Sequence, residues 1–295
     1  MAIRKGDFLI GKLKDLVYRK VKNTQVAQSA PGKGRVRQTT GTKKLAYLFG
    51  RASMLGKIIR YQSADQIFGF HDGPMVNRLT KKLQEILLHY YPVDKETHPF
   101  NEESFIQLKG FDFNLNSPLH KSLWAEPLIT LKGHELQFIL PEIKIPEELK
   151  FPGNCDSCVI TISTNYFDLE KGYLNIWPDV KKIEIKKNSP LLEKQEFSFQ
   201  LPEGCLCLTT MAIQYFTKKH QLTVLYNHKD FNPAQICSAV VTEGTFVFQK
   251  DFPWQQTKWT KAAFDKYATT NQASPHSQPS YSLHTYMEPD DNAHF

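Results

Sequence analysis

The spacing of apolar residues changes once along the chain, from a helical repeat before residue 100 to alternation after it. Between Thr42 and Arg60, apolar side chains recur three or four residues apart, which predicts an amphipathic helix. Its apolar stripe consists of Leu45, Leu48, Phe49, Ala52, Leu55 and Ile59. A second helix is predicted between Pro74 and Pro92, because proline suits a first helical turn and stops a helix further on. Its core stripe consists of Met75, Leu79, Leu83, Ile86 and Tyr90.

After Phe100, short runs alternate between apolar and polar residues and are separated by Pro, Gly, Asn and Asp, as is typical of strands. The predicted strands cover residues 105–113, 134–140, 158–164, 173–177, 182–186, 196–200, 206–216, 222–226, 238–242 and 245–249. Glu243 and Gly244 are expected to form a two-residue hairpin turn before the last of these strands. Many short strands without helices between them favour a β-sandwich.

Shorter signals complete the layout at both ends of the chain. Residues 16–29 contain two β-prone runs around Lys22-Asn23, which predicts a hairpin. A last short helix is predicted from Trp254 to Tyr267, and the composition of the residues that follow predicts a poorly ordered tail. The expected fold is therefore α+β and mainly β. We divide it into a basic N-terminal hairpin and helix module (1–98), an antiparallel β-sandwich (99–267) and a disordered tail (268–295).

Positive charge is concentrated in the first sixty residues. They hold fifteen Lys or Arg against Asp7 and Asp15, a net charge of +13, and because the whole chain carries +7, residues 61–295 must carry −6. Such an uneven distribution predicts that the N-terminal part binds a polyanion or an acidic surface. The predicted binding residues are Lys33, Arg35, Arg37, Lys43, Lys44 and Arg51. Those on the first helix lie off the apolar stripe and are expected to face solvent or a partner.

Two kinds of partner fit this charge. One is an acidic protein surface, including that of a neighbouring copy of the chain. The other is nucleic acid, since arginine donates two hydrogen bonds to one phosphate and the glycines of segment 32–37 let the backbone approach. Proteins that bind nucleic acid commonly interleave aromatic residues with the basic ones, and this segment does not. We therefore favour protein docking or self-association and keep nucleic acid as the alternative.

Motifs that would indicate catalysis are absent from the sequence: it contains no Gly-x-x-x-x-Gly-Lys-Ser/Thr, His-Glu-x-x-His or Gly-x-Ser-x-Gly. Cys155-x-x-Cys158 and Cys205-x-Cys207 could together bind zinc, but ordinary buried thiols are the favoured interpretation. We expect a non-catalytic protein without metal or cofactor. No apolar run approaches the ~20 residues of a membrane helix, so we expect a cytoplasmic protein with reduced cysteines and no membrane partner.

The N-terminal residues also show a family resemblance. Its motifs are Gly11-Lys12-Leu13, Val17-Tyr18-Arg19, Val26 with Ser29 and Pro31, and Phe49-Gly50-Arg51-Ala52-Ser53. This opening resembles uncharacterised proteins common in Bacteroidota, although Lys14 stands where those proteins usually have glycine and Gln28 where they have arginine. The resemblance covers the first sixty residues. It implies a similar layout with a β-rich C-terminal half, and it implies no catalytic residue.

Overall fold

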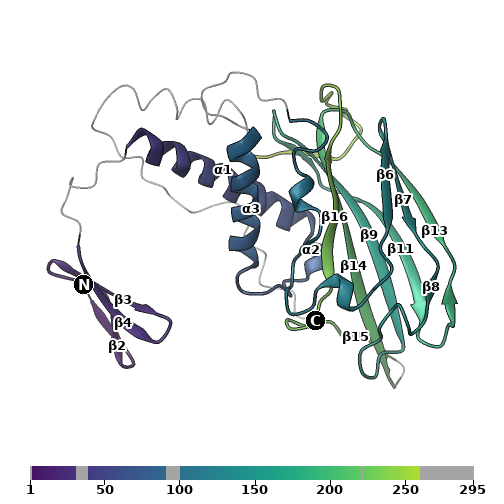
Figure 1. Ribbon diagram of the computed structural model, residues 1–295, viewed down its shortest axis with the longest axis horizontal. Coiled ribbons are helices and arrows are strands. Elements are labelled where there is room, and N and C mark those ends of the chain that lie inside the picture. Colours follow the sequence, from purple (N-terminus) through teal and green to yellow (C-terminus); the bar gives the residue numbers. More distant parts are fainter. Residues whose placement is uncertain (1, 31–38, 91–99, 221, 260–295) are drawn as a thin grey trace.

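The computed structural model describes residues 2–30, 39–90, 100–220 and 222–259 (Figure 1). Its α-helices are α1 (Thr40–Gln62), α2 (Ala64–Ile67) and α3 (Met75–Tyr90), and its 3-10 helices are η1 (Ile106–Leu108) and η2 (Leu119–Lys121). The strands are β1 (Ile3–Lys5), β2 (Phe8–Leu13), β3 (Leu16–Val21), β4 (Thr24–Ser29), β5 (Phe111–Asp112), β6 (Leu128–Lys132), β7 (Glu135–Leu140), β8 (Ile143–Lys144), β9 (Ser157–Asp168), β10 (Tyr173–Asn175), β11 (Asp179–Lys186), β12 (Leu191–Leu192), β13 (Gln195–Gln200), β14 (Cys205–Lys219), β15 (Leu222–Leu225), β16 (Ala234–Val241) and β17 (Trp254–Gln256). The predicted α+β, mainly β fold is confirmed.

The largest sheet is built around β9 and β14. Its strand order is β17-β10-β9-β14-β16-β5, and in addition β11 pairs with β9 and β15 with β14. β9 and β14 run antiparallel along their whole common length, from Ser157 opposite Phe216 to Asp168 opposite Cys205. The smaller sheets have the orders β1-β2-β3-β4, β13-β7-β6 and β12-β8. The predicted hairpin at 16–29 is present as β3 and β4.

Each face of the largest sheet packs against a different partner. One face shares an apolar cluster with α1 and α3, which includes Leu55, Leu83, Leu208 and Ile236. The other face shares a second cluster with β7 and β13 of the three-stranded sheet. Figure 1 shows the helices on one side of β14 and β16 and the strands β6, β7 and β13 on the other. The layers are thus helices, large sheet and small sheet, and the predicted two-sheet sandwich is not confirmed.

The helices form where the periodicity predicted them. Thr39 caps α1, since its side-chain oxygen accepts a hydrogen bond from the Thr42 backbone N–H at 3.2 Å. Gly56 lies where α1 meets α3, and a Cβ at this position would sit 3.4 Å from the Leu83 side chain. The helices therefore approach closely at this point. Of the predicted α3 stripe, the first four members are buried.

Amide side chains fix the corner between α1 and α2 against the sheet. The Gln62 side chain donates hydrogen bonds to the Tyr166 carbonyl at 3.0 Å and to the Asn175 side-chain oxygen at 3.1 Å. Asn232 donates to the carbonyls of Gln66 and Ile67, both at 3.1 Å. Gln62, Gln66 and Ile67 lie in helices, and Tyr166 lies in the central strand β9. These bonds therefore set the position of the helical layer on the sheet.

Residues 105–113 were predicted to form one strand, and this prediction is wrong. They form η1 followed by the two-residue β5. Phe105 and Leu108 are buried three residues apart at the two ends of the single turn of η1, a 3-10 spacing, and pack with the helices. Gly110 then turns the chain with a φ of +80°, a conformation that glycine adopts without strain.

Three predictions near the end of the described chain are also wrong. Residues 245–249 form no strand, and Glu243-Gly244 forms no hairpin turn, because only Phe246 turns inward, packing beside Tyr173 and Trp254. Trp254–Gln256 form strand β17, not the start of a helix, because they pair with β10. Residues 260–267 of that predicted helix and the predicted tail 268–295 lie outside the described residues.

Candidate functional site

The N-terminal sheet (β1–β4, Ile3–Ser29) is one of the basic regions that the structure describes. Residues 1–30 contain seven Lys or Arg and two acids, a net charge of +5. Basic and apolar residues lie next to each other along the strands; in β3, Arg19 and Lys20 lie between Tyr18 and Val21, and Arg19 is opposite Val26. The Lys20 ammonium lies 4.2 Å from the centre of the Phe8 ring, a cation–π contact within the sheet.

This sheet has an apolar surface that the described residues do not cover. None of residues 2–30 is buried, and each is half-buried or exposed. Leu13 and Leu16, which lie opposite each other next to the β2–β3 turn, are 48% and 39% exposed. The other exposed large apolar residues of the sheet are Ile3, Leu9 and Val21. Apolar side chains at this density on a sheet are typical of an interaction surface.

Of the six predicted binding residues, three lie on α1 and the other three, Lys33, Arg35 and Arg37, lie outside the described residues. Lys43 is exposed, as expected, and Lys44 is half-buried. The prediction for Arg51 is wrong: its side chain is buried, and its guanidinium carbon lies 3.9 Å from the centre of the Trp259 ring. All three described residues lie on α1, and none belongs to the N-terminal sheet.

The burial of Arg51 has a simple geometric cause. Arg51 lies three residues after Leu48 and four before Leu55, so it shares their helical face. Trp259 offers a flat ring on which a guanidinium can stack, and its own Nε1–H donates to the Leu169 carbonyl at 2.8 Å. Arg51 thus joins α1 to the end of the described chain. Conversely, Leu45 and Phe49 of the predicted stripe are exposed.

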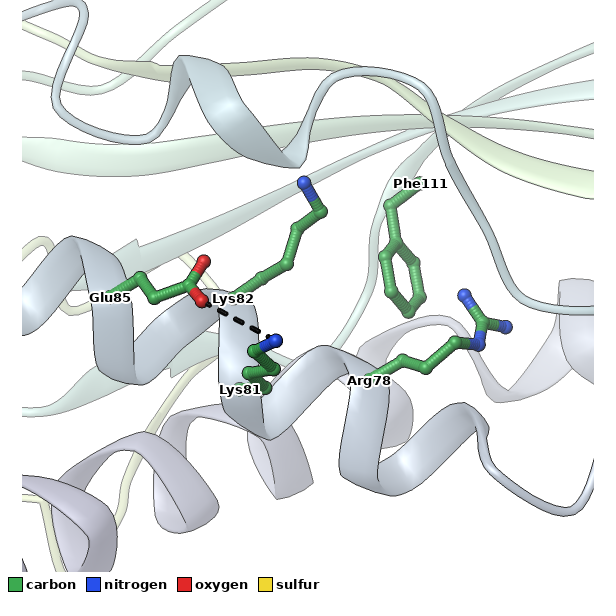
Figure 2. A pocket seen from close by; sticks show the side chains of 5 residues that line it. All are labelled: Arg78, Lys81, Lys82, Glu85 and Phe111. Atoms are coloured by element: carbon green, nitrogen blue, oxygen red, sulfur yellow. Dashed lines mark ion pairs between the residues drawn. The ribbon is translucent and has the colours of Figure 1, made fainter.

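A groove between α3 and β5 is a second candidate site. It has a volume of about 270 Å³ and is lined by Arg78, Lys81, Lys82, Glu85 and Phe111 (Figure 2). The four charged side chains come from α3, and Phe111 comes from β5. Lys81 and Glu85 form an ion pair one helical turn apart, with 3.9 Å between nitrogen and oxygen. No pattern in the sequence predicted this groove, although its cations belong to the polar face of the predicted helix.

Arg78 is the one cation of the groove that the fold holds in place. Its Nη2 donates to the Asp72 carboxylate and, at 3.0 Å, to the Asp112 carbonyl. Its guanidinium carbon lies 4.8 Å from the centre of the Phe111 ring. The Asp72 carboxylate also accepts a hydrogen bond from the Leu115 backbone N–H at 2.9 Å. These bonds connect α3 to β5 and to the loop that follows it.

The cysteines do not assemble into one metal site. Cys158 lies opposite Tyr215 at one end of the β9–β14 pair, and Cys207 lies opposite Tyr166 toward the other end. Eight residues of β9 separate these positions, which is about 26 Å along a strand. The four thiols of the zinc hypothesis therefore cannot bind one ion, since zinc–sulfur bonds are about 2.3 Å long.

All five cysteines are buried and free. Burial raises the pKa of the Cys158 and Cys237 thiols to about 12, and it raises the pKa of the Cys207 thiol well above its ordinary value. Such thiols stay protonated and are poor nucleophiles at neutral pH. The Cys155-x-x-Cys158 motif leads into strand β9, where a redox motif of this type would normally begin a helix.

Within the described ranges, no group of three or more His, Cys, Asp or Glu side chains is arranged to hold a metal ion. The helices in the same ranges include none that is long and apolar enough to cross a membrane. No protein-family model, curated protein or solved structure matches the chain. The resemblance of its opening residues to Bacteroidota proteins stays a prediction.

Proposed function

We propose that this is a non-catalytic interaction protein whose basic N-terminal part docks on an acidic protein surface. The observation that carries the proposal is the N-terminal sheet, which presents apolar side chains and a net charge of +5 while none of its described residues is buried. A strand pair or small sheet gains stability from an apolar face that packs against something. A partner that covers Leu13 and Leu16 would supply this packing.

The occupant that we propose is a second copy of the same chain. Residues 61–295 carry a net charge of −6, which complements the basic N-terminal part. Complementary charge speeds up encounter and fixes orientation, whereas buried apolar area supplies most of the affinity. The N-terminal sheet can make both contributions, because it carries five exposed large apolar residues as well as its lysines and arginines.

Nucleic acid is the alternative partner, because the same lysines and arginines could neutralise phosphates. The two partners make different demands on the sheet. Phosphate binding depends on the cations and needs no contribution from Leu13 or Leu16, whereas docking on protein depends on both.

Two double variants separate these demands. The first variant, Leu13→Ser with Leu16→Ser, removes exposed apolar area. The second variant, Lys12→Gln with Arg19→Gln, removes two charges from the same two strands, β2 and β3. If the chain docks on itself, both variants lower the native mass toward 34 kDa, measured by light scattering. If it binds nucleic acid, only the charge variant has an effect, and the effect is a loss of co-purifying absorbance at 260 nm.

A third variant tests the predicted residues of the basic segment. Replacing Lys33, Arg35, Arg37, Lys43 and Lys44 by Gln removes five charges and leaves the buried face of α1 intact. Under the docking proposal this variant also shifts the native mass toward the monomer. A wild-type protein that is monomeric and free of nucleic acid at cellular salt would contradict both functions.

A further inference from the structure

The groove between α3 and β5 combines positive charge with one aromatic wall. Its charged lining residues are three cations and Glu85, which leaves a net charge of +2. Asp72, behind the groove, pairs with Arg78 and lowers the local sum to +1. Because Glu85 already pairs with Lys81, Lys82 is the cation of this set that forms no ion pair among the described residues.

Arg78 is pre-organised for an anion. Asp72 and the Asp112 carbonyl share its Nη2, and the Phe111 ring lies against its guanidinium. Its buried Nε has no hydrogen-bond partner within the described part of the chain. A guanidinium that is fixed before binding loses little side-chain entropy when a ligand arrives, which raises affinity.

The arrangement of the side chains matches a ligand with a doubly charged head and an apolar body. Figure 2 shows Arg78 and Lys82 extending from α3 on either side of the Phe111 ring in this view. The fixed guanidinium and the unpaired ammonium can each contact a different oxygen of one head group. The ring offers an apolar wall beside them for the rest of the ligand.

The size of the groove limits what it can hold. Pockets for drug-sized ligands are roughly 300–1,000 Å³. At about 270 Å³ the groove suits a smaller molecule, and it is too small for a folded partner. Among small anions, a phosphate monoester carries about two negative charges at neutral pH, which matches the two cations better than a carboxylate or a sulfate ester does.

We propose that the groove lined by Arg78, Lys82 and Phe111 binds the phosphate monoester of a small organic molecule. The proposal is independent of the docking function, because it uses none of the residues of the N-terminal sheet or of the basic segment. A protein that fails to self-associate could still bind this ligand, and the reverse is also true.

Titration calorimetry on the full chain tests the proposal with three probes: phenyl phosphate, phenyl sulfate and inorganic phosphate. We expect phenyl phosphate to bind most tightly, because phenyl sulfate lacks the second charge and inorganic phosphate lacks the ring. Its affinity should fall as the pH drops below ~6, where the phosphate takes up its second proton. Equal binding of all three probes would overturn the proposed ligand class.

Matched lysine variants locate the site. Lys82→Ala should weaken phenyl phosphate binding about tenfold, the usual effect of losing one charge-assisted hydrogen bond. Lys57→Ala, at an exposed position on α1, removes the same charge elsewhere and should leave binding unchanged. Lys82→Arg should retain most of the affinity. Arg78→Lys should weaken binding further, and its unfolding temperature would show whether the fold survives the loss of the Asp72 contact.

Two outcomes would contradict a binding site in this groove. If wild-type protein binds phenyl phosphate no more tightly than several millimolar, or if Lys57→Ala weakens binding as much as Lys82→Ala does, the groove is not a phosphate ester site. In the second case the binding would reflect the positive charge of the whole chain.

Discussion

The N-terminal sheet and the large sheet are both antiparallel, and they differ in what covers them. In β9, ten of the twelve residues from Ser157 to Asp168 are buried, including the last nine. In β3 no residue is buried. The strands of the two sheets are built from similar β-prone residues, so local propensity does not explain the difference. Layers on both faces account for the burial of β9, whereas the described part of the chain forms no such layer on β3.

This difference indicates that the large sheet contributes mainly to stability and the N-terminal sheet mainly to binding. A sheet between two layers contributes to the core that holds the chain folded. A sheet with exposed apolar residues contributes little to that core and keeps its apolar area available for a partner. We therefore expect substitutions in the large sheet to change the free energy of unfolding, and substitutions in the N-terminal sheet to change association.

The largest contrast is expected between two truncations of large aliphatic side chains. Ile162→Ala removes three carbons from a fully buried position of β9 and should lower the free energy of unfolding by about 2–5 kcal/mol. Leu16→Ala truncates a side chain that is 39% exposed, and should change the free energy of unfolding by less than ~0.5 kcal/mol. Urea unfolding, at concentrations where the chain is monomeric, measures both.

A Leu16→Ala effect as large as that of Ile162→Ala would contradict the comparison. It would mean that the N-terminal sheet is covered within the same chain, and the docking proposal would lose its main support.

The second contrast is between two cations of α1. Arg51→Gln removes a buried guanidinium that stacks on Trp259, and should lower the free energy of unfolding by about 2 kcal/mol, as expected for a desolvated cation–π contact. Lys43→Gln, at an exposed position eight residues earlier, should change it by less than ~0.5 kcal/mol. Thermal unfolding followed by circular dichroism compares the two variants. Equal effects on the two variants would indicate that the Arg51 side chain is exposed, as was predicted from the sequence.

Arg51 also shows where sequence reasoning succeeds and where it fails. Helical periodicity located α1 and most of its buried residues, because that pattern depends on one element alone. The burial of Arg51 depends on Trp259, which is more than two hundred residues away in sequence, and no local pattern shows such a neighbour. The same applies to the groove, where Arg78 and Phe111 come together only in the folded chain.

The strands show the same limit. Alternation predicted the positions of β7, β11, β13 and β14. It did not separate η1 from a strand, because Ile106 and Leu108, and then Phe111 and Phe113, are spaced two residues apart as in a strand. It also missed β1 and β2, because neither strand alternates between apolar and polar residues. The uneven distribution of charge could be predicted from the composition. That part of the positive charge lies on a sheet without buried residues could not.

The third contrast concerns alkaline pH. Burial raises the pKa of Cys237 to about 12, whereas in the unfolded chain the thiol titrates near its ordinary value. Between these values the unfolded chain binds fewer protons than the folded chain, so stability falls as the pH rises from ~9 toward 12. The N-terminal sheet contains no cysteine and adds nothing to this loss. Urea midpoints at pH 8 to 11 should fall less steeply in Cys237→Ala than in the wild type. Parallel slopes would contradict the buried, protonated thiol.

The smallest effect on stability, and the sharpest test of the comparison, is expected from single exposed cations on the two sheets. Arg19 lies on β3 and Lys182 on the edge strand β11, and both are exposed. Replacing either residue by Gln removes one charge and no buried contact, so the free energy of unfolding should change by less than ~0.5 kcal/mol in both variants. Only Arg19→Gln removes charge from the proposed docking surface. It should therefore weaken self-association, and more so at low salt, where the charges are least screened. Sedimentation at two salt concentrations measures this effect. If Lys182→Gln weakens association equally, the overall charge of the chain controls assembly, and the N-terminal sheet is not the surface on which it docks.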